Sequence, residues 1–451
     1  MKRAISAIFA AGSLALLMTS ATGLAVLAEE ASVYEGYTAE EFASLHQTTV
    51  IKSEESPTGY YVTFRYPNSE ETERVRLFGE YNFSDEMHTN VFQTAHYTSE
   101  DWQDGYFPAF VSRDSENQVI EMELDEENQV WSVTLPLPNG TWNYAFYIGG
   151  VGEELTDTEE AVLVWDPNNE PIIADLTLSD DEYMPMEKLS RIYVPIDEEK
   201  QQNTAYNPYE IPREDEQQGT VIFETLQNRN GDELTTGIYL PYGFDADREE
   251  PYKVLVYQVG GGNAENGPFM MGAADIITDN LIAAGETESY IIVTQNGNDF
   301  VWDRELILSN ITEYILPYVE ENYNVSTAAE DHAFLGISMG GATSVYAMLH
   351  NADDFGYFAV FSAPVTDDIS EEIGSGDITG LGLEDKNIFF ACGSCDFVAG
   401  LGNEREGSYL QILSAFTSSQ IPYTNMVYNG GHQFTVWRPA YVDFVKNVLW
   451  K

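Results

Sequence analysis

The residues best suited to chemistry in this sequence are Gly336-Ile-Ser-Met-Gly340. The apolar run before them, residues 332–335, predicts a buried strand, and the Ala-, Met- and Leu-containing run after them, residues 342–350, predicts a helix. A G-x-S-x-G motif between a strand and a helix is typical of a nucleophile elbow, whose strained turn exposes the serine. The spacing therefore predicts Ser338 as a nucleophile at the carboxyl edge of a sheet, with the Met339 N–H at the helix start.

A serine hydroxyl needs an adjacent base, and the base needs an orienting carboxylate. With this kind of elbow the order along the chain is serine, acid, histidine. His432 is the histidine that follows the last predicted strand, within a glycine-containing loop, and is the expected base. Asp396 lies just beyond the predicted strand Asn387–Ala391 and is the expected acid, with Asp367 and Asp368 as the fallback. In so acidic a chain a single aspartate is often only a solvated side chain. The position directly after a predicted strand therefore decides which aspartate is the expected acid.

An acyl-transfer site also needs two N–H donors for the oxyanion of the tetrahedral intermediate. The run Gly260-Gly-Gly-Asn263 directly follows the predicted strand Lys253–Val259, where a glycine backbone can approach a reacting carbonyl. We expect one donor from Met339 and the other from Gly261. A phosphate-binding Walker loop is excluded because no Gly-Lys-Ser/Thr follows. Chemistry of this kind requires no cofactor and no metal ion.

The charge balance is extreme, with 20 basic against 75 acidic residues and a formal net charge of −55. Such a chain repels nucleic acid and anionic membranes and suits neutral or polymeric substrates. Acidic composition can also indicate disorder, but 43% hydrophobic and 13% aromatic residues favour folded domains.

The N-terminus has the pattern of a bacterial-type secretory signal peptide. Met1-Lys-Arg3 is basic, an apolar stretch follows to about Leu27, and small residues lead to a cleavage site after Ala28. We therefore expect a secreted, extracellular protein, with an uncleaved membrane anchor as the alternative. The two cysteines, Cys392 and Cys395, form either a local disulfide or two reduced thiols, and they do not open a helix as a redox motif should.

Hydropathy patterns divide the chain further. Short alternating runs with turn residues between them predict a β-sandwich, and buried strands alternating with helices predict an α/β domain with a mostly parallel sheet flanked by helices. The longest helix is expected at Asp303–Tyr323 and the last at Trp437–Trp450. The expected divisions are a signal peptide at 1–28, a lead-in at 29–58, the sandwich at 59–178, a polar linker at 179–218, and the α/β domain at 219–451.

Residues 219–451 resemble carbohydrate esterase family 1, the feruloyl and acetyl-xylan esterases. The resemblance rests on Tyr239-Leu-Pro-Tyr-Gly-Phe244, Gly260-Gly-Gly-Asn263, Gly336-Ile-Ser-Met-Gly-Gly341, Ala391-Cys-Gly-Ser-Cys-Asp396 and Gly430-Gly-His-Gln-Phe-Thr-Val-Trp-Arg438. It implies an α/β-hydrolase fold in which Ser338, Asp396 and His432 form the catalytic triad.

The N-terminal region resembles a family-48 carbohydrate-binding module, an early-set immunoglobulin-like sandwich. The resemblance rests on Val75-Arg-Leu-Phe-Gly-Glu80, residues 130–147 and Asp166-Pro-Asn-Asn169. It implies that Trp131, Trp142 and Tyr144 either stack on sugar rings or fill the core of the sandwich.

Together these features predict a secreted serine esterase that removes feruloyl or acetyl groups from plant polysaccharide such as arabinoxylan, or from its acylated oligosaccharides. Two alternatives stay open: a siderophore (enterochelin-type) esterase, and a non-catalytic carbohydrate-binding protein. The sequence leaves the choice of acyl group and the oligomeric state undecided.

Overall fold

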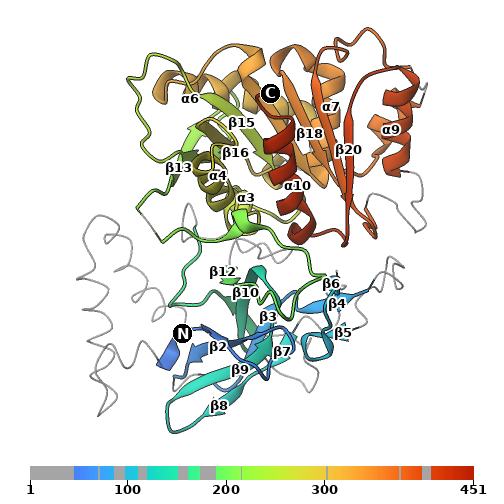
Figure 1. Cartoon of the computed structure of the whole chain (residues 1–451). Helices are drawn as coiled ribbons and strands as arrows, with labels where there is room; N and C mark the ends of the chain where they lie inside the picture. The colour runs from blue at the N-terminus through green and yellow to red at the C-terminus, as the bar shows by residue number, and fades with distance from the viewer. Residues whose placement is uncertain are drawn as a thin grey trace.

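The computed structural model describes residues 45–69, 72–85, 97–109, 119–150, 161–172, 189–214, 216–300, 303–374, 377–398 and 408–451. The predicted signal peptide, residues 1–28, and the first part of the predicted lead-in lie outside the described residues. Two regions of different architecture follow one another along the chain: among the described residues, the N-terminal region consists mainly of β-sheets, and the C-terminal region contains one large sheet with helices (Figure 1).

The C-terminal region contains an eight-stranded sheet in the order β13-β14-β16-β15-β17-β18-β19-β20. β14 is antiparallel to β13 and β16, and all pairings from β16 to β20 are parallel. This arrangement confirms the predicted α/β architecture with a mostly parallel sheet. The strands are β13 (Thr220–Gln227), β14 (Glu233–Leu240), β15 (Lys253–Gln258), β16 (Tyr290–Thr294), β17 (His332–Ile337), β18 (Tyr357–Phe361), β19 (Asn387–Gly393) and β20 (Thr424–Tyr428).

Helices cover both faces of this sheet. One face carries α3 (Gly267–Met270), α4 (Ala274–Ala283) and α10 (Phe434–Asn447). The other carries α5 (Arg304–Asn310), α6 (Leu316–Asn322), α7 (Met339–His350), α8 (Asp367–Ile373) and α9 (Ser408–Ser418). None of the described helices combines the length and hydrophobicity that crossing a bilayer requires.

The central strands are buried on both faces because their side chains alternate between the two helical layers. In β15, Val254 and Val256 belong to the core under α5–α9, whereas Leu255 and Tyr257 belong to the core under α3, α4 and α10. This double burial explains the uninterrupted apolar runs that predicted these strands from the sequence.

The predicted helix Asp303–Tyr323 is present but is not one regular helix. A π-helical turn, Ile311–Ile315, joins α5 to α6. Pro317 lies in the first turn of α6 and has no N–H to donate to the preceding turn. The wider π turn accommodates this break in the hydrogen-bond ladder.

The N-terminal region contains two antiparallel sheets around one apolar core. Their orders are β1-β2-β9-β8 and β11-β10-β3-β7, with β12 also paired to β10, and a small sheet β5-β4-β6 lies beside them. The strands are β1 (Thr49–Lys52), β2 (Tyr60–Pro67), β3 (Val75–Gly79), β4 (Asn82–Ser84), β5 (Tyr97–Thr98), β6 (Phe107–Pro108), β7 (Val119–Glu121), β8 (Glu123–Asp125), β9 (Val130–Pro136), β10 (Gly140–Gly149), β11 (Ala161–Val164) and β12 (Ser190–Val194).

The three aromatic residues singled out in the sequence fill this core. Trp131, Trp142 and Tyr144 are 8%, 4% and 0% exposed, and all three pack within the cluster between the two sheets. Of the two roles expected for them, packing is therefore the one the structure gives, and none of the three offers a free ring face to a sugar.

Two strands lie in segments that the sequence patterns assign elsewhere. β1 falls within the expected lead-in and pairs with β2, and β12 falls within the expected linker and pairs with β10. Both are short edge strands whose partners are distant in sequence or joined by a turn, so local patterning does not reveal the pairing.

Asp279 of α4 connects the start of the α/β region to its sheet. Its carboxylate accepts hydrogen bonds from the Tyr239 hydroxyl at 2.7 Å and from the Gly219 N–H at 2.9 Å. Asp279 is only 8% exposed, and burial raises the pKa of its carboxyl to about 6 despite these hydrogen bonds.

A raised carboxyl pKa means that the folded state binds this proton more tightly than the unfolded state. The contribution of Asp279 to stability is therefore greatest near pH 4 and is lost as the pH rises to about 6. We predict that the melting temperature of Asp279→Asn, relative to wild type, increases between pH 4 and pH 7. A relative melting temperature that falls over this range would contradict the shift.

Candidate active site

The turn from β17 into α7 holds Ser338 in a strained conformation. Its backbone angles are φ 56° and ψ −120°, and its N–H donates to the Phe361 carbonyl at 2.9 Å. A Cβ on Gly336 would overlap the Gly340 carbonyl, and a Cβ on Gly340 would overlap the Gln258 carbonyl. The two motif glycines are thus required by close contact, as expected for a nucleophile elbow.

Ser338, His432 and Asp396 form a continuous hydrogen-bonded chain. His432 Nε2 lies 2.9 Å from Ser338 Oγ, and His432 Nδ1 lies 3.0 Å and 3.2 Å from the two carboxylate oxygens of Asp396. A carboxylate accepts but does not donate, so Nδ1 carries the proton and Nε2 is left to accept one from the serine. The structure brings these three sequence-predicted residues together in the arrangement that nucleophilic catalysis requires.

The fallback acids do not take part in this chain. Asp367 begins α8, and Asp368 pairs with Arg304 at 2.7 Å. Asp396, by contrast, is completely buried next to His432 and accepts a further hydrogen bond from the Val398 N–H at 2.9 Å.

Aromatic side chains fix the imidazole ring. Trp437 of α10 packs edge-on against His432, with ring centroids 4.9 Å apart, and Phe397 lies 5.2 Å away. The Trp437 indole N–H donates to Ser362 Oγ at 2.8 Å, which fixes the tryptophan in turn. His432 therefore has little freedom to leave the serine.

A small cavity of about 70 Å³ opens at the serine. Gly261 lines it, and Met339 is the first residue of α7, so both N–H groups expected to bind an oxyanion belong to segments beside Ser338. Among the described residues, no group of His, Cys, Asp and Glu is arranged to hold a metal ion. The lining residues are Glu80, Gly260, Gly261, Asn263, Met271, Ser338, His432, Gln433, Phe434 and Trp437.

The two cysteines are free thiols, which decides the alternative that the sequence left open. Burial is the main cause that raises the pKa of Cys392 to about 12 and that of Cys395 to about 11. Cys395 Sγ lies 3.0 Å from the Gly430 carbonyl, so this thiol helps to hold the loop before His432. Neither cysteine is suited to act as a thiolate nucleophile.

The N-terminal region contributes directly to this site, which sequence analysis did not find. Glu80, between β3 and β4, lines the cavity. The Gln433 side-chain amide donates to the Pro108 carbonyl at 2.9 Å, and Phe107 packs against Cys395. No local signal predicts these contacts, because they depend on how two separately patterned regions dock.

Arg438 of α10 is one of the polar connections between the two regions. Its guanidinium donates to the Met271 carbonyl at 2.7 Å and to the Thr141 carbonyl at 2.8 Å, and it lies 2.9 Å from the Glu210 carboxylate. Arg438 and Glu210 have side chains only 3% and 7% exposed. In Figure 1, α3 and the first turns of α10 accordingly face the N-terminal sheets.

Residues 227–390 match the family model described as putative esterase. Over these residues the chain is therefore similar to esterases. Its eight-stranded sheet is thus an α/β-hydrolase-type fold, and the resemblance of this region to carbohydrate esterase family 1 holds.

Two curated proteins are similar to part of this chain. An endo-1,4-beta-xylanase/feruloyl esterase of Xylanibacter ruminicola is 27% identical over 239 residues, which are 50% of this chain and 31% of that protein. Endo-1,4-beta-xylanase Y of Acetivibrio thermocellus is 29% identical over 157 residues, 32% of this chain and 14% of that protein. The chain thus spans a third or less of the length of these relatives.

A solved structure is similar over almost the whole chain. The enterobactin esterase of Shigella flexneri is 15% identical, with a TM-score of 0.52, over 92% of this chain and 99% of that one. At this identity the likeness concerns the fold. It includes the N-terminal region as well as the C-terminal region, residues 219–451, which is named the esterase region below.

The buried pair between Arg438 and Glu210 generates a stability prediction. Arg438→Met should lower the free energy of unfolding by about 3–5 kcal/mol, since it leaves a buried carboxylate without its cation. Adding Glu210→Gln to this variant should restore part of the loss, because the uncompensated charge is then gone. Denaturant unfolding of the two single variants and the double variant checks this, and a double variant that is less stable than Arg438→Met would contradict it.

Proposed function

We propose that the protein is a secreted serine esterase that hydrolyses feruloyl or acetyl esters on plant cell-wall polysaccharide such as arabinoxylan, or on its acylated oligosaccharides. The observation that carries the proposal is the hydrogen-bonded chain Ser338–His432–Asp396 on a strained elbow, with 2.9 Å between Ser338 Oγ and His432 Nε2. The predicted signal peptide supports secretion.

In the first half-reaction Ser338 Oγ attacks the ester carbonyl while His432 Nε2 accepts the hydroxyl proton. Asp396 accepts the Nδ1–H bond, which holds the tautomer and stabilises the imidazolium that forms. The proton then passes to the oxygen of the leaving alcohol, and an acyl-serine remains.

In the second half-reaction a water molecule takes the place of the alcohol. His432 accepts a proton from this water, which attacks the acyl-serine. When the intermediate collapses, His432 returns the proton to Ser338 Oγ, and the carboxylic acid is released. In both tetrahedral intermediates the N–H groups of Met339 and Gly261 bind the oxyanion. Loss of one such donor typically costs about 3 kcal/mol of transition-state stabilisation.

The proposed substrate class rests on the names of the curated relatives and on the net charge of the chain. The curated relatives have xylanase names, and one is also named a feruloyl esterase. A chain with a net charge of −55 approaches a neutral polysaccharide without the repulsion that it exerts on an anionic polymer.

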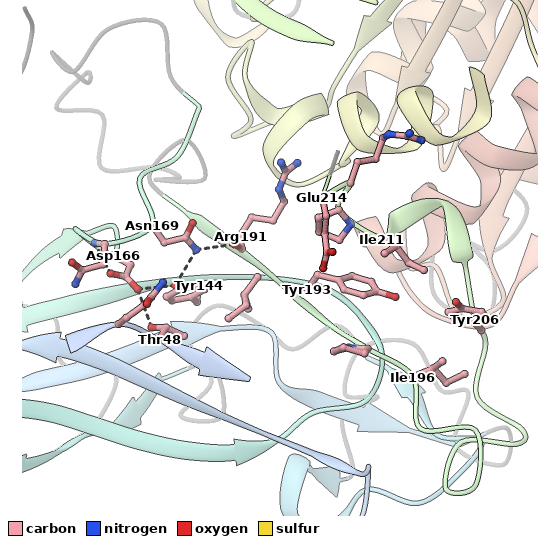
Figure 2. Close-up of a pocket in the computed structure, with 16 residues that line it drawn as sticks. Thr48, Tyr144, Asp166, Asn169, Arg191, Tyr193, Ile196, Tyr206, Ile211 and Glu214 are labelled. Carbon is pink, nitrogen blue, oxygen red and sulfur yellow. Dashed lines mark hydrogen bonds between the residues drawn. The ribbon is translucent and has the colours of Figure 1, made fainter. Parts of the chain in front are cut away.

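We further propose that the N-terminal region is an immunoglobulin-like, carbohydrate-binding sandwich. Since Trp131, Trp142 and Tyr144 are core residues, a sugar would bind elsewhere. A cavity of about 590 Å³ lies between β12 and the segment after it. Figure 2 shows Asp166 at one end of this cavity, Tyr206 at the other and Tyr193 between them, a mixture of aromatic and polar groups that suits a neutral sugar.

The siderophore-esterase alternative has support from the fold alone. The similarity to the enterobactin esterase covers both regions, at 15% identity. The predicted signal peptide disfavours an enzyme that acts on a siderophore in the cytoplasm, and so does the charge, because ferric catecholates are anions. Preferred turnover of a ferric siderophore over methyl ferulate and acetyl xylan would establish this alternative.

Ser338→Ala should lower ester hydrolysis by at least about 10⁴-fold, because the attacking oxygen is gone while the fold is unchanged. The assay measures kcat/KM on methyl ferulate, 4-nitrophenyl acetate, and acetylated and feruloylated arabinoxylan. Ser370→Ala, in α8 and not among the residues that line the cavity at Ser338, is the matched control and should keep wild-type activity. Equal rates in Ser338→Ala and wild type would reject the esterase site, and sugar binding without any hydrolysis would support the non-catalytic alternative.

Tyr206, which is 43% exposed beside the large cavity, tests sugar binding. Tyr206→Ala should weaken the affinity for arabinoxylan about 3- to 10-fold, the loss expected for one aromatic contact. Tyr242→Ala, which removes a tyrosine that is 56% exposed in the esterase region, should leave the affinity unchanged. Affinity electrophoresis with soluble arabinoxylan measures both, and equal retention of the two variants would remove the cavity as a binding site.

A further inference from the structure

One carboxylate from the N-terminal region lines the cavity at Ser338. Glu80 lies between β3 and β4 and shares this cavity with Ser338 and His432 of the esterase region. Among the described lining residues it is the acidic one, and none of them is a lysine or an arginine. Glutamate carries a negative charge at neutral pH in most settings.

The two residues that follow Glu80 are well packed. Tyr81 is 2% exposed and packs between Phe64 and Trp142, with ring centroids 5.4 Å and 6.1 Å away. Asn82, the next residue, is also 2% exposed, and its carbonyl accepts from the Ala109 N–H at 2.9 Å. A half-buried glutamate on so well packed a connection keeps its place at the cavity.

The docking of the two regions fixes the cavity itself. Gln433, which follows His432, donates to the Pro108 carbonyl, and Arg438 donates to the Thr141 carbonyl. These contacts come from the same N-terminal sheets that carry Glu80. Glu80 is therefore part of the cavity wall because of how the two regions dock.

We propose that Glu80 is a specificity-determining residue: it makes the enzyme discriminate against esters that carry a negative charge near the scissile bond, and it leaves neutral esters unaffected. This inference rests on the proposed function of the site at Ser338. A cavity of about 70 Å³ keeps every lining group close to a bound ester, and a like charge at such range is repelled strongly where water is partly excluded. The substrate class that remains is neutral acylated sugar.

Two matched pairs of esters test this, because the charge can lie on either side of the scissile bond. The acyl pair is 4-nitrophenyl hydrogen succinate against 4-nitrophenyl butyrate, and the leaving-group pair is 4-carboxyphenyl acetate against 4-carbamoylphenyl acetate. In at least one pair Glu80→Gln should raise kcat/KM for the anionic ester about 5- to 10-fold relative to the neutral one. The ratio within each pair is the readout, because a general effect of the substitution on the site acts on both esters alike.

Glu126→Gln removes one exposed charge from the turn between β8 and β9 and is the matched control for a general change in net charge. It should leave both ratios unchanged. In a second measurement, about 0.5 M NaCl should raise the relative rate of the anionic ester more in wild type than in Glu80→Gln, since salt screens a repulsion at residue 80 that only wild type has.

Unchanged ratios in Glu80→Gln, or an equal rise in Glu126→Gln, would overturn the role of Glu80. Ser338→Ala is assayed with the same four esters, so that failure of the site is distinguishable from failure of this inference. Hydrolysis that survives in Ser338→Ala overturns the site and the inference with it. Hydrolysis lost in Ser338→Ala but insensitive to Glu80→Gln overturns only the inference.

Discussion

The close crossing of β17 and α7 is the constraint on which the site depends. The backbone at Ser338, with φ 56°, is a conformation that a serine rarely adopts, and it persists because the surrounding sheet leaves no alternative. Gly336 and Gly340 allow the helix to start directly against the neighbouring strand. The turn therefore places the hydroxyl of Ser338 and the first N–H groups of α7 side by side. The proposed nucleophile and the proposed oxyanion donor thus depend on the same geometric requirement.

The parallel sheet then supplies the other two groups. β19 and β20 are parallel to β17, so the loops after all three strands leave the sheet at the same edge. Asp396 comes from the loop after β19, and His432 comes from the loop after β20. The ring packing of Trp437 and the thiol of Cys395 hold the histidine loop from two sides, which explains why a loop can keep a hydrogen bond of 2.9 Å to the serine.

Much of this could be predicted from the sequence, because the deciding signals are local. Buried parallel strands appear as apolar runs, and an elbow requires small residues at fixed spacing. The sequence therefore predicted these strands, and it predicted Ser338, Asp396 and His432, which lie within hydrogen-bonding distance of one another. The strands β1 and β12 were not predicted, because the pairing of an edge strand depends on partners outside the local pattern. Glu80 was not predicted as a site residue, because its place at the cavity depends on how the two regions dock. In a chain with 75 acidic residues, composition does not distinguish one glutamate from the others.

The docking contacts make the two regions one functional unit. Arg438 is six residues beyond His432, within the helix that carries Trp437, and it bonds to the N-terminal strand β10 and to Glu210. A shift of the N-terminal region would therefore act on the helix that fixes the imidazole as well as on the wall that holds Glu80. A buried ion pair adds little net stability but is costly to break, so it favours one docked arrangement over its neighbours. Fixed docking is what a specificity wall built from a second region requires, since a carboxylate that moved freely would not discriminate between substrates.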